Sequence, residues 1–159
     1  MNVQVEAKAV DERGSEVLSP SECLRLLAES GGAPGRLGIL VQGRVVVLPY
    51  NFLTDGDGLV LRVGPGATLE ALLSEPLVAF EVDHFEPSAI DPFAWSVLVQ
   101  GEARVVRDPV GLDELRALGV APFIPEPGEL FVRISIETVS GRRFRINALA
   151  ATRYERRSS

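Results

Sequence analysis

The 159-residue sequence contains one cysteine, one histidine, one methionine and one tryptophan. A single cysteine, Cys23, excludes an internal disulfide and is compatible with a reducing compartment. We place it on the apolar side of a helix as a small buried hydrophobe. A single histidine weakens the metal-like group Asp83, His84 and Glu86, because neighbours on a strand point to opposite faces. We therefore expect no metal site.

The sequence also lacks an apolar run long enough to span a membrane, and its first residues, MNVQVEAKAVDERG, lack the apolar segment of a signal peptide. Its net charge is −6, which makes nucleic acid an unexpected partner. Arginines gather after Ser140, and we interpret segment 147–159 as a solvated basic tail, with a local anion site as the alternative. These features predict a soluble cytoplasmic protein without a membrane partner.

What the sequence does contain is a dense series of short strand patterns. Residues 36–73 read as a three-strand meander with turns at Gln42-Gly43 and at segment 55–58, leading into a helix. Further strands are predicted at 77–83, 95–106, 129–139 and 142–146, with a bulge at Gly101 and a turn at Ser140-Gly141. Short helices are expected after the capping box that begins at Ser19, and at 67–73 and 112–118. We predict one mainly-β domain spanning residues 1–159, a six- to seven-stranded antiparallel barrel with short flanking helices and an N-terminal arm at 1–17.

A glycine loop, Gly64-Pro65-Gly66, precedes the helix predicted from Ala67 to Leu73. Free backbone N–H groups and the helix dipole attract anions at such a helix start. Arg62 stands just before the loop and can offer a guanidinium to a phosphate. This segment predicts a bound phosphorylated cofactor.

Other familiar sites are missing. The sequence has neither a Gly-x-Ser-x-Gly elbow nor a Gly-Lys-Ser/Thr step after the glycine loop, which argues against a hydrolase elbow and a nucleotide P-loop. Asp55 and Asp57 begin like a calcium loop, but Leu59 occupies the next ligand position, so we interpret the segment as a turn.

Four segments of the sequence form an ordered set: GRLGILVQGRVVVLPYNFLTDGDGLVLRVGPG, PLVAFEVDHFEP, WSVLVQGEARVV and GRRF. Together they resemble the pyridoxamine 5′-phosphate oxidase-like family of flavin-binding split β-barrels, and more narrowly its small actinobacterial-type members. The resemblance implies a homodimeric split β-barrel that binds FMN, or in some members a deazaflavin, at the subunit interface.

The expected cofactor contacts follow from this resemblance and from what a flavin requires, an apolar wall for the ring and cations or N–H groups for the phosphate. The wall is expected at Leu48, Pro49, Tyr50 and Asn51. The phosphate side is expected at Arg62, Val63, Thr68 and Leu69, and the contacts across the interface at Trp95 and Ser96. Two structural alternatives stay open, an edge strand with an ordinary proline at Pro49 and a core role for Trp95.

The sequence departs from the family pattern at two positions. Val63 and Thr68 stand where relatives often carry threonine and lysine. Losing two charge-assisted contacts of about 1.5–3 kcal/mol each would weaken FMN binding by roughly 10²–10⁴-fold. We predict an FMN-dependent oxidoreductase, with weakly bound FMN, acting on an unidentified small molecule other than pyridoxamine phosphate. The alternatives are a deazaflavin-dependent reductase and a non-catalytic dimer that has lost flavin binding.

Overall fold

The computed structural model describes residues 15–56, 58–86, 91–122, 124–125 and 127–146. This part of the chain contains three helices, α1 (Pro20–Glu29), α2 (Ala67–Ser74) and α3 (Pro109–Leu118). Its strands are β1 (Glu16–Leu18), β2 (Pro34–Val41), β3 (Arg44–Asn51), β4 (Leu53–Asp55), β5 (Gly58–Val63), β6 (Leu77–Glu86), β7 (Phe93–Val105), β8 (Leu130–Ser135) and β9 (Thr138–Arg145).

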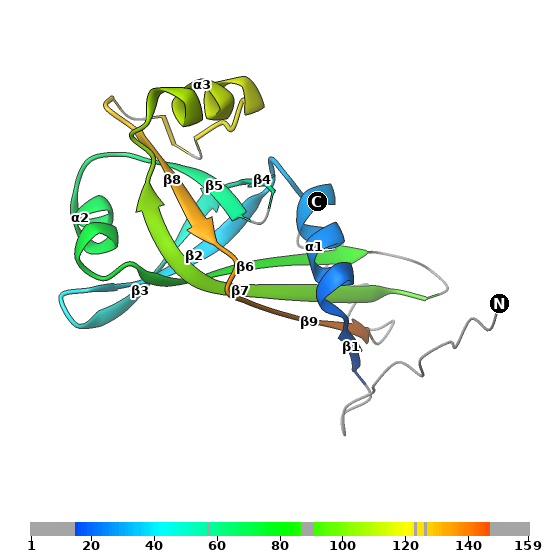
Figure 1. The fold of residues 1–159 in the computed structure, drawn as a ribbon. Helices are drawn as coiled ribbons and strands as arrows, with labels where there is room; N and C mark the ends of the chain where they lie inside the picture. The colour runs from blue at the N-terminus through cyan, green and yellow to red at the C-terminus, as the bar shows by residue number, and fades with distance from the viewer. Residues whose placement is uncertain (1–14, 57, 87–90, 123, 126, 147–159) are drawn as a thin grey trace.

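All strand pairs are antiparallel, and the main order is β3-β2-β6-β7-β8-β5-β4. Strand β7 pairs with β9 over residues 93–100 and with β8 from Ala103 onward. It is the long curved strand of Figure 1, and it belongs both to the part built from β3, β2, β6 and β9 and to the part built from β8, β5 and β4. The predicted mainly-β antiparallel architecture is confirmed.

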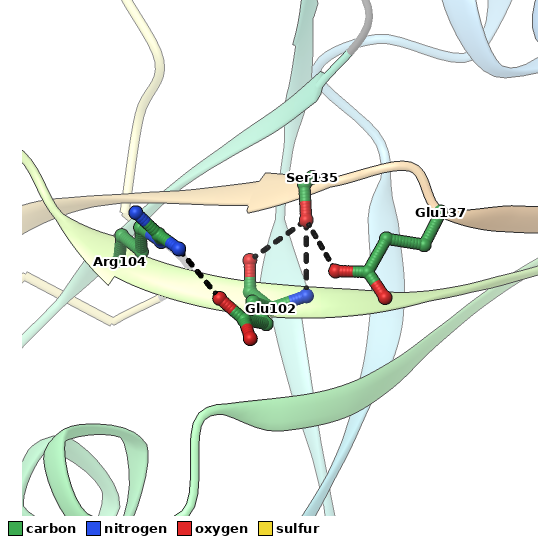
Figure 2. A network of polar contacts seen from close by, with 4 residues as sticks. All are labelled: Glu102, Arg104, Ser135 and Glu137. Carbon is green, nitrogen blue, oxygen red and sulfur yellow. Dashed lines mark hydrogen bonds and ion pairs between the residues drawn. The ribbon is translucent and has the colours of Figure 1, made fainter.

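The change of partner along β7 occurs beside Gly101. A Cβ atom at this position would lie 1.8 Å from the carbonyl oxygen of Ser135, so only glycine allows the two backbones to approach. Figure 2 shows how polar groups hold this joint: the Glu102 N–H donates to Ser135 Oγ at 3.0 Å, and Ser135 Oγ contacts Glu137 Oε1 at 3.2 Å. Arg104 donates to the Glu102 carboxylate at 2.7 Å. Against β6 the register continues through Gly101 without the predicted bulge.

The local sequence signals at α1 and at the first hairpin are confirmed. Ser19 Oγ accepts the Glu22 N–H at 3.3 Å, and the Glu22 carboxylate accepts the Ser19 N–H at 2.9 Å, which is the predicted capping box. Between β2 and β3, Gln42 and Gly43 have φ values of 50° and 74°, the left-handed backbone of a tight hairpin turn. Both features depend only on residues close in sequence.

The predicted turn at Ser140-Gly141 is wrong. Strand β8 ends at Ser135, the chain turns at residues 136–137, and β9 runs straight through Gly141. A Cβ atom at Gly141 would lie 2.7 Å from Cys23 Sγ and 3.1 Å from a Leu18 methyl carbon. This glycine therefore serves a close contact with α1 and β1 rather than a turn.

The predicted strand number was also too low, because the described residues form nine strands rather than six or seven. The short strands β1 and β4 account for the difference. Strand β6 continues to Glu86, three residues beyond the predicted end at Asp83, so His84 lies within the strand. The cause is pairing with the long β7, which extends a strand past its apolar pattern.

The core lies between the inner faces of the curved sheet and the helices α1 and α2. Cys23 is fully buried there, as predicted. Its burial is the main cause that raises the pKa of its thiol, and the nearby Glu22 carboxylate raises this pKa further. Phe52 and Phe80 pack edge to face with ring centroids 5.3 Å apart. Other fully buried aliphatic side chains include Leu27, Leu37, Leu59, Leu61, Leu115, Ile134, Val60, Val63, Val82, Val97, Val99 and Val132.

The ends of the chain fall largely outside the described residues. Of the predicted arm at 1–17, residues 16–17 belong to β1, which pairs with β9. The predicted basic tail at 147–159 lies outside the described part. Within that part, every helix is too short or too polar to cross a membrane.

Candidate functional site

A cavity of about 310 Å³ opens where the glycine loop faces β3. Its lining comes from four places: strand β3, the end of β5, the loop with the first turn of α2, and the segment before β8. The lining residues are Leu48, Pro49, Tyr50, Arg62, Gly64, Pro65, Gly66, Ala67, Thr68, Ile124 and Glu129. We call it the loop cavity. It thus brings the predicted apolar wall and the predicted phosphate cradle together.

The start of α2 is built to leave backbone donors free. Its N-cap, Gly66, has φ 134°, a backbone conformation that favours glycine, and no side chain caps the helix. The first N–H groups of a helix have no intrahelical acceptor, and the dipole adds partial positive charge there. Since Gly66, Ala67 and Thr68 all line the loop cavity, an anion in it can accept these hydrogen bonds.

Arg62 lies beside this helix start, and its side chain is 35% exposed. Its Nη2 donates to Glu129 Oε2 at 2.7 Å, and the Glu129 side chain is only 4% exposed. The guanidinium also lies 5.7 Å from the centroid of the Phe131 ring. A guanidinium has five N–H donors, so Glu129 can orient Arg62 while other donors remain for a ligand. The same carboxylate lowers the positive charge of the cavity.

Five of the ten predicted site residues line the loop cavity: Leu48, Pro49, Tyr50, Arg62 and Thr68. The edge-strand alternative at Pro49 is also confirmed. Strand β3 is the end strand of the sheet, and it pairs with β2 without a break from the 34–51 pair to the 41–44 pair. Proline has no backbone N–H to donate, and an edge strand tolerates this because no strand pairs with its outer side.

The other five predicted residues lie elsewhere. The Asn51 side chain donates to the Pro122 carbonyl oxygen at 3.5 Å. The Val63 side chain is fully buried in the core, and Leu69 packs against that core from α2. Trp95 and Ser96 lie on β7, and neither lines the loop cavity. Within one chain, the residues predicted to reach across the interface, Trp95 and Ser96, therefore lie apart from the loop cavity.

Trp95 has its own surroundings. It is 5% exposed and lines a second cavity, between α1 and strands β6, β7 and β9, of about 550 Å³. Its ring centroid lies 5.9 Å from that of His84, whose Nε2 is 3.1 Å from the Glu86 carboxylate. Trp95 is therefore a core residue, as the structural alternative proposed, and the small exposed part of its side chain lines this cavity. No group of three or more metal-binding side chains occurs among the described residues.

The outward surface of β3, β2 and β6 is unusually apolar. Val45, Val47 and Leu77 are 76%, 60% and 68% exposed, and Leu40 is 43% exposed. Val45 lies opposite Leu40 in the register, and Val47 lies opposite Gly38 and, beyond it, Ala79. We call Leu40, Val45, Val47 and Leu77 the outer sheet face. Arg36 closes one side of it, with Nη1 2.9 Å from Glu81 Oε2 and 2.8 Å from Asp83 Oδ1.

The amino-acid sequence itself matches a known family. A family model described as pyridoxamine 5′-phosphate oxidase matches residues 19–143. The chain belongs to this family. No curated protein matches the sequence.

Solved structures of the same fold agree with this assignment. A Mycobacterium smegmatis FAD-binding protein is 30% identical, with 82% of this chain and 99% of that chain covered and a TM-score of 0.67. A Mesorhizobium loti FAD-binding protein is 26% identical over 82% of this chain and 98% of its own, with a TM-score of 0.69. A Corynebacterium glutamicum protein named after pyridoxamine 5′-phosphate oxidase is 27% identical over 83% and 99%, with a TM-score of 0.70. The fold is thus the split β-barrel of this oxidase family.

Glu129 lines the loop cavity but was not among the predicted site residues. Glu129 was interpreted only as the beginning of a strand. Its relation to Arg62 becomes visible once β5 and β8 are paired, because Arg62 lies opposite Phe131 and Glu129 is two residues before Phe131. Diagonal neighbours on one face of an antiparallel pair are within reach of long side chains. The signal therefore requires the strand register, which the sequence alone does not contain.

Proposed function

We propose that this chain is a flavin-dependent oxidoreductase acting on a small molecule, with the flavin phosphate held in the loop cavity. The observation that supports it best is the convergence of Arg62, the uncapped start of α2 and the β3 wall on one cavity. The predicted FMN has a terminal phosphate for this cradle. FAD is the second candidate, because two relatives are named as FAD-binding proteins. The cytoplasm is the expected location.

The residues of the chain would divide the work as follows. Arg62 and the N–H groups of the α2 start bind the phosphate, while Glu129 orients the guanidinium. Leu48, Pro49 and Tyr50 form an apolar wall that excludes water from one side of the cavity. A bound flavin supplies hydride transfer, with electrons from a nicotinamide or a reduced deazaflavin. We assign no side chain as acid or base.

We further propose that two copies of the chain form the complete site. The outer sheet face offers an apolar surface for an isologous two-fold dimer. Such a dimer would let Trp95 and Ser96 of one copy approach the loop cavity of the other, which a single chain does not allow. Sedimentation at micromolar concentration should give about twice 17.1 kDa.

Flavin reconstitution tests the proposal directly. The purified chain is mixed with FMN, FAD or riboflavin, and the protein fraction is separated and examined for flavin absorbance. We expect both phosphorylated flavins to be retained and riboflavin to be retained less. A chain that keeps none of them and instead binds a deazaflavin coenzyme would support the reductase alternative. A dimer that binds none of these ligands would support the non-catalytic alternative.

The family pattern suggests a change that should strengthen the site. The resemblance pointed to Val63→Thr with Thr68→Lys, but Val63 is fully buried and a hydroxyl there would enter the core. Thr68 lines the cavity, so Thr68→Lys alone is the cleaner variant. The ammonium contact should outweigh the unfavourable helix dipole and tighten FMN binding by about 1–2 kcal/mol, roughly 5–30-fold.

Calorimetric titration with FMN and riboflavin measures this effect. Ser74→Lys adds the same charge at the other end of α2 and should leave both affinities unchanged. If Thr68→Lys leaves FMN binding unchanged or weakens it, no flavin phosphate lies at the start of α2.

A further inference from the structure

Another cavity lies beside the loop cavity, under α3. It has a volume of about 730 Å³, within the range of roughly 300–1,000 Å³ typical of small-molecule sites. Its walls come from α3, the segments before and after this helix, the end of β5 and the beginning of β8. The lining residues are Arg62, Val106, Arg107, Leu112, Leu115, Arg116, Gly119, Val120, Ala121, Pro122, Glu129, Leu130 and Phe131. We call it the α3 cavity.

The two cavities are adjacent, because Arg62 and Glu129 line both. A phosphate held by Arg62 in the loop cavity would therefore stand at the boundary of the α3 cavity. A flavin that ends at this phosphate would fill only the smaller space. A flavin extended through the phosphate would continue into the larger one.

The charges of the α3 cavity suit such an extension. Arg107 and Arg116 add two guanidiniums to that of Arg62, and Glu129, already paired with Arg62, is the one acid in the lining. Arg116 Nη1 contacts Asp113 at 2.8 Å and keeps its other donors. Arg107 has no ion-pair partner among the residues that the structure describes. A second phosphate beyond the first would thus meet positive charge.

The floor of the α3 cavity is apolar and firmly built. Val60, Leu115 and Val120 form a small buried cluster beneath it, and Phe131 packs against that cluster. The helix above is fixed by its own sequence: the Asp108 carboxylate accepts the Gly111 N–H at 2.6 Å, and Gly119 ends the helix in a left-handed conformation, φ 71°. A flat aromatic base can lie on such a floor next to the guanidinium rim.

We propose that the α3 cavity binds the adenosine-phosphate half of FAD, so that this chain prefers FAD to FMN. The inference rests on the proposed flavin site in the loop cavity and adds a second anchoring site to it. Arg107 and Arg116 hold the adenosine-side phosphate, and the surface around Leu112 and Phe131 contacts the adenine ring.

Titration of the full chain with FAD, FMN and riboflavin tests this assignment. We expect the unmodified chain to bind FAD at least about tenfold more tightly than FMN, since charge-assisted contacts beyond the first phosphate add to affinity. The double variant Arg107→Ala/Arg116→Ala should weaken FAD binding by roughly 10–100-fold and change FMN binding by less than about twofold. AMP should compete with FAD and leave FMN binding unaffected.

The matched control is Arg145→Ala, which removes an exposed, ion-paired arginine of β9 that lines neither cavity and should leave the FAD preference intact. Ala121→Trp provides a second variant that fills the α3 cavity without removing charge, and it should weaken FAD selectively. Equal affinities for FAD and FMN in the unmodified chain, or equal losses for both in the double variant, would overturn the assignment while the flavin site stands. Binding of no flavin at all would overturn both proposals.

Discussion

Placing carboxylates at Val45 and Val47 should convert the proposed dimer into a monomer and abolish flavin binding. Both side chains are more than half exposed in the single chain and belong to the outer sheet face. In a two-fold dimer built on this face, Val45→Asp/Val47→Asp would bury four carboxylates without partners. Each unpaired ion costs several kcal/mol, so the dimer dissociation constant should rise by at least about 10³-fold.

Sedimentation and flavin titration of the same samples measure both consequences. Val110→Asp is the matched control, because Val110 is 71% exposed on α3 and lies away from the outer sheet face. It should leave the mass and the flavin affinity unchanged. A double variant that remains dimeric would place the interface elsewhere. A monomer that still binds flavin with full affinity would show that one chain suffices for the site.

Arg62→Ala should weaken FMN binding by about 1.5–3 kcal/mol, roughly 10–150-fold, and leave riboflavin binding nearly unchanged. The variant removes the guanidinium and also leaves the nearly buried Glu129 carboxylate without this partner. That charge would then stand beside the phosphate, so the loss should approach the upper end of the range.

A companion variant separates the two contributions. Arg62→Ala/Glu129→Gln removes the uncompensated charge and should recover part of the lost FMN affinity, whereas Glu129→Gln alone should bind FMN at least as tightly as the unmodified chain. Calorimetric titration of all three with FMN and riboflavin decides the matter. Equal losses for both ligands would mean that Arg62 supports folding or packing rather than phosphate binding.

The parts of the fold that sequence could predict are those determined by neighbouring residues. The Ser19 and Glu22 capping box, the Gln42-Gly43 hairpin and the glycine loop before α2 each depend on a few consecutive side chains or backbone angles. Strand alternation and the ordered family segments then sufficed for the mainly-β architecture. The family resemblance also pointed to Arg62 and to Leu48, Pro49 and Tyr50, and the structure places these residues around one cavity.

What sequence could not predict depends on contacts between distant segments. The Ser140-Gly141 pair is typical of a turn. The structure places Gly141 inside a strand, where the close contact with Cys23 explains the glycine. Glu129 reaches Arg62 through the register of β5 and β8. The α3 cavity likewise forms between segments that are far apart in sequence, so no local sequence pattern predicts it.

The loop cavity lies between the two parts of the sheet that β7 joins. One wall of that cavity, on β3, belongs to one part of the sheet, and Arg62, on β5, belongs to the other. Strand β7 is the sole strand of the described chain that is paired into both parts, and it passes between them at the contact of Gly101 with Ser135. The β3 residues and Arg62 on the two sides of the loop cavity therefore belong to different parts of the sheet.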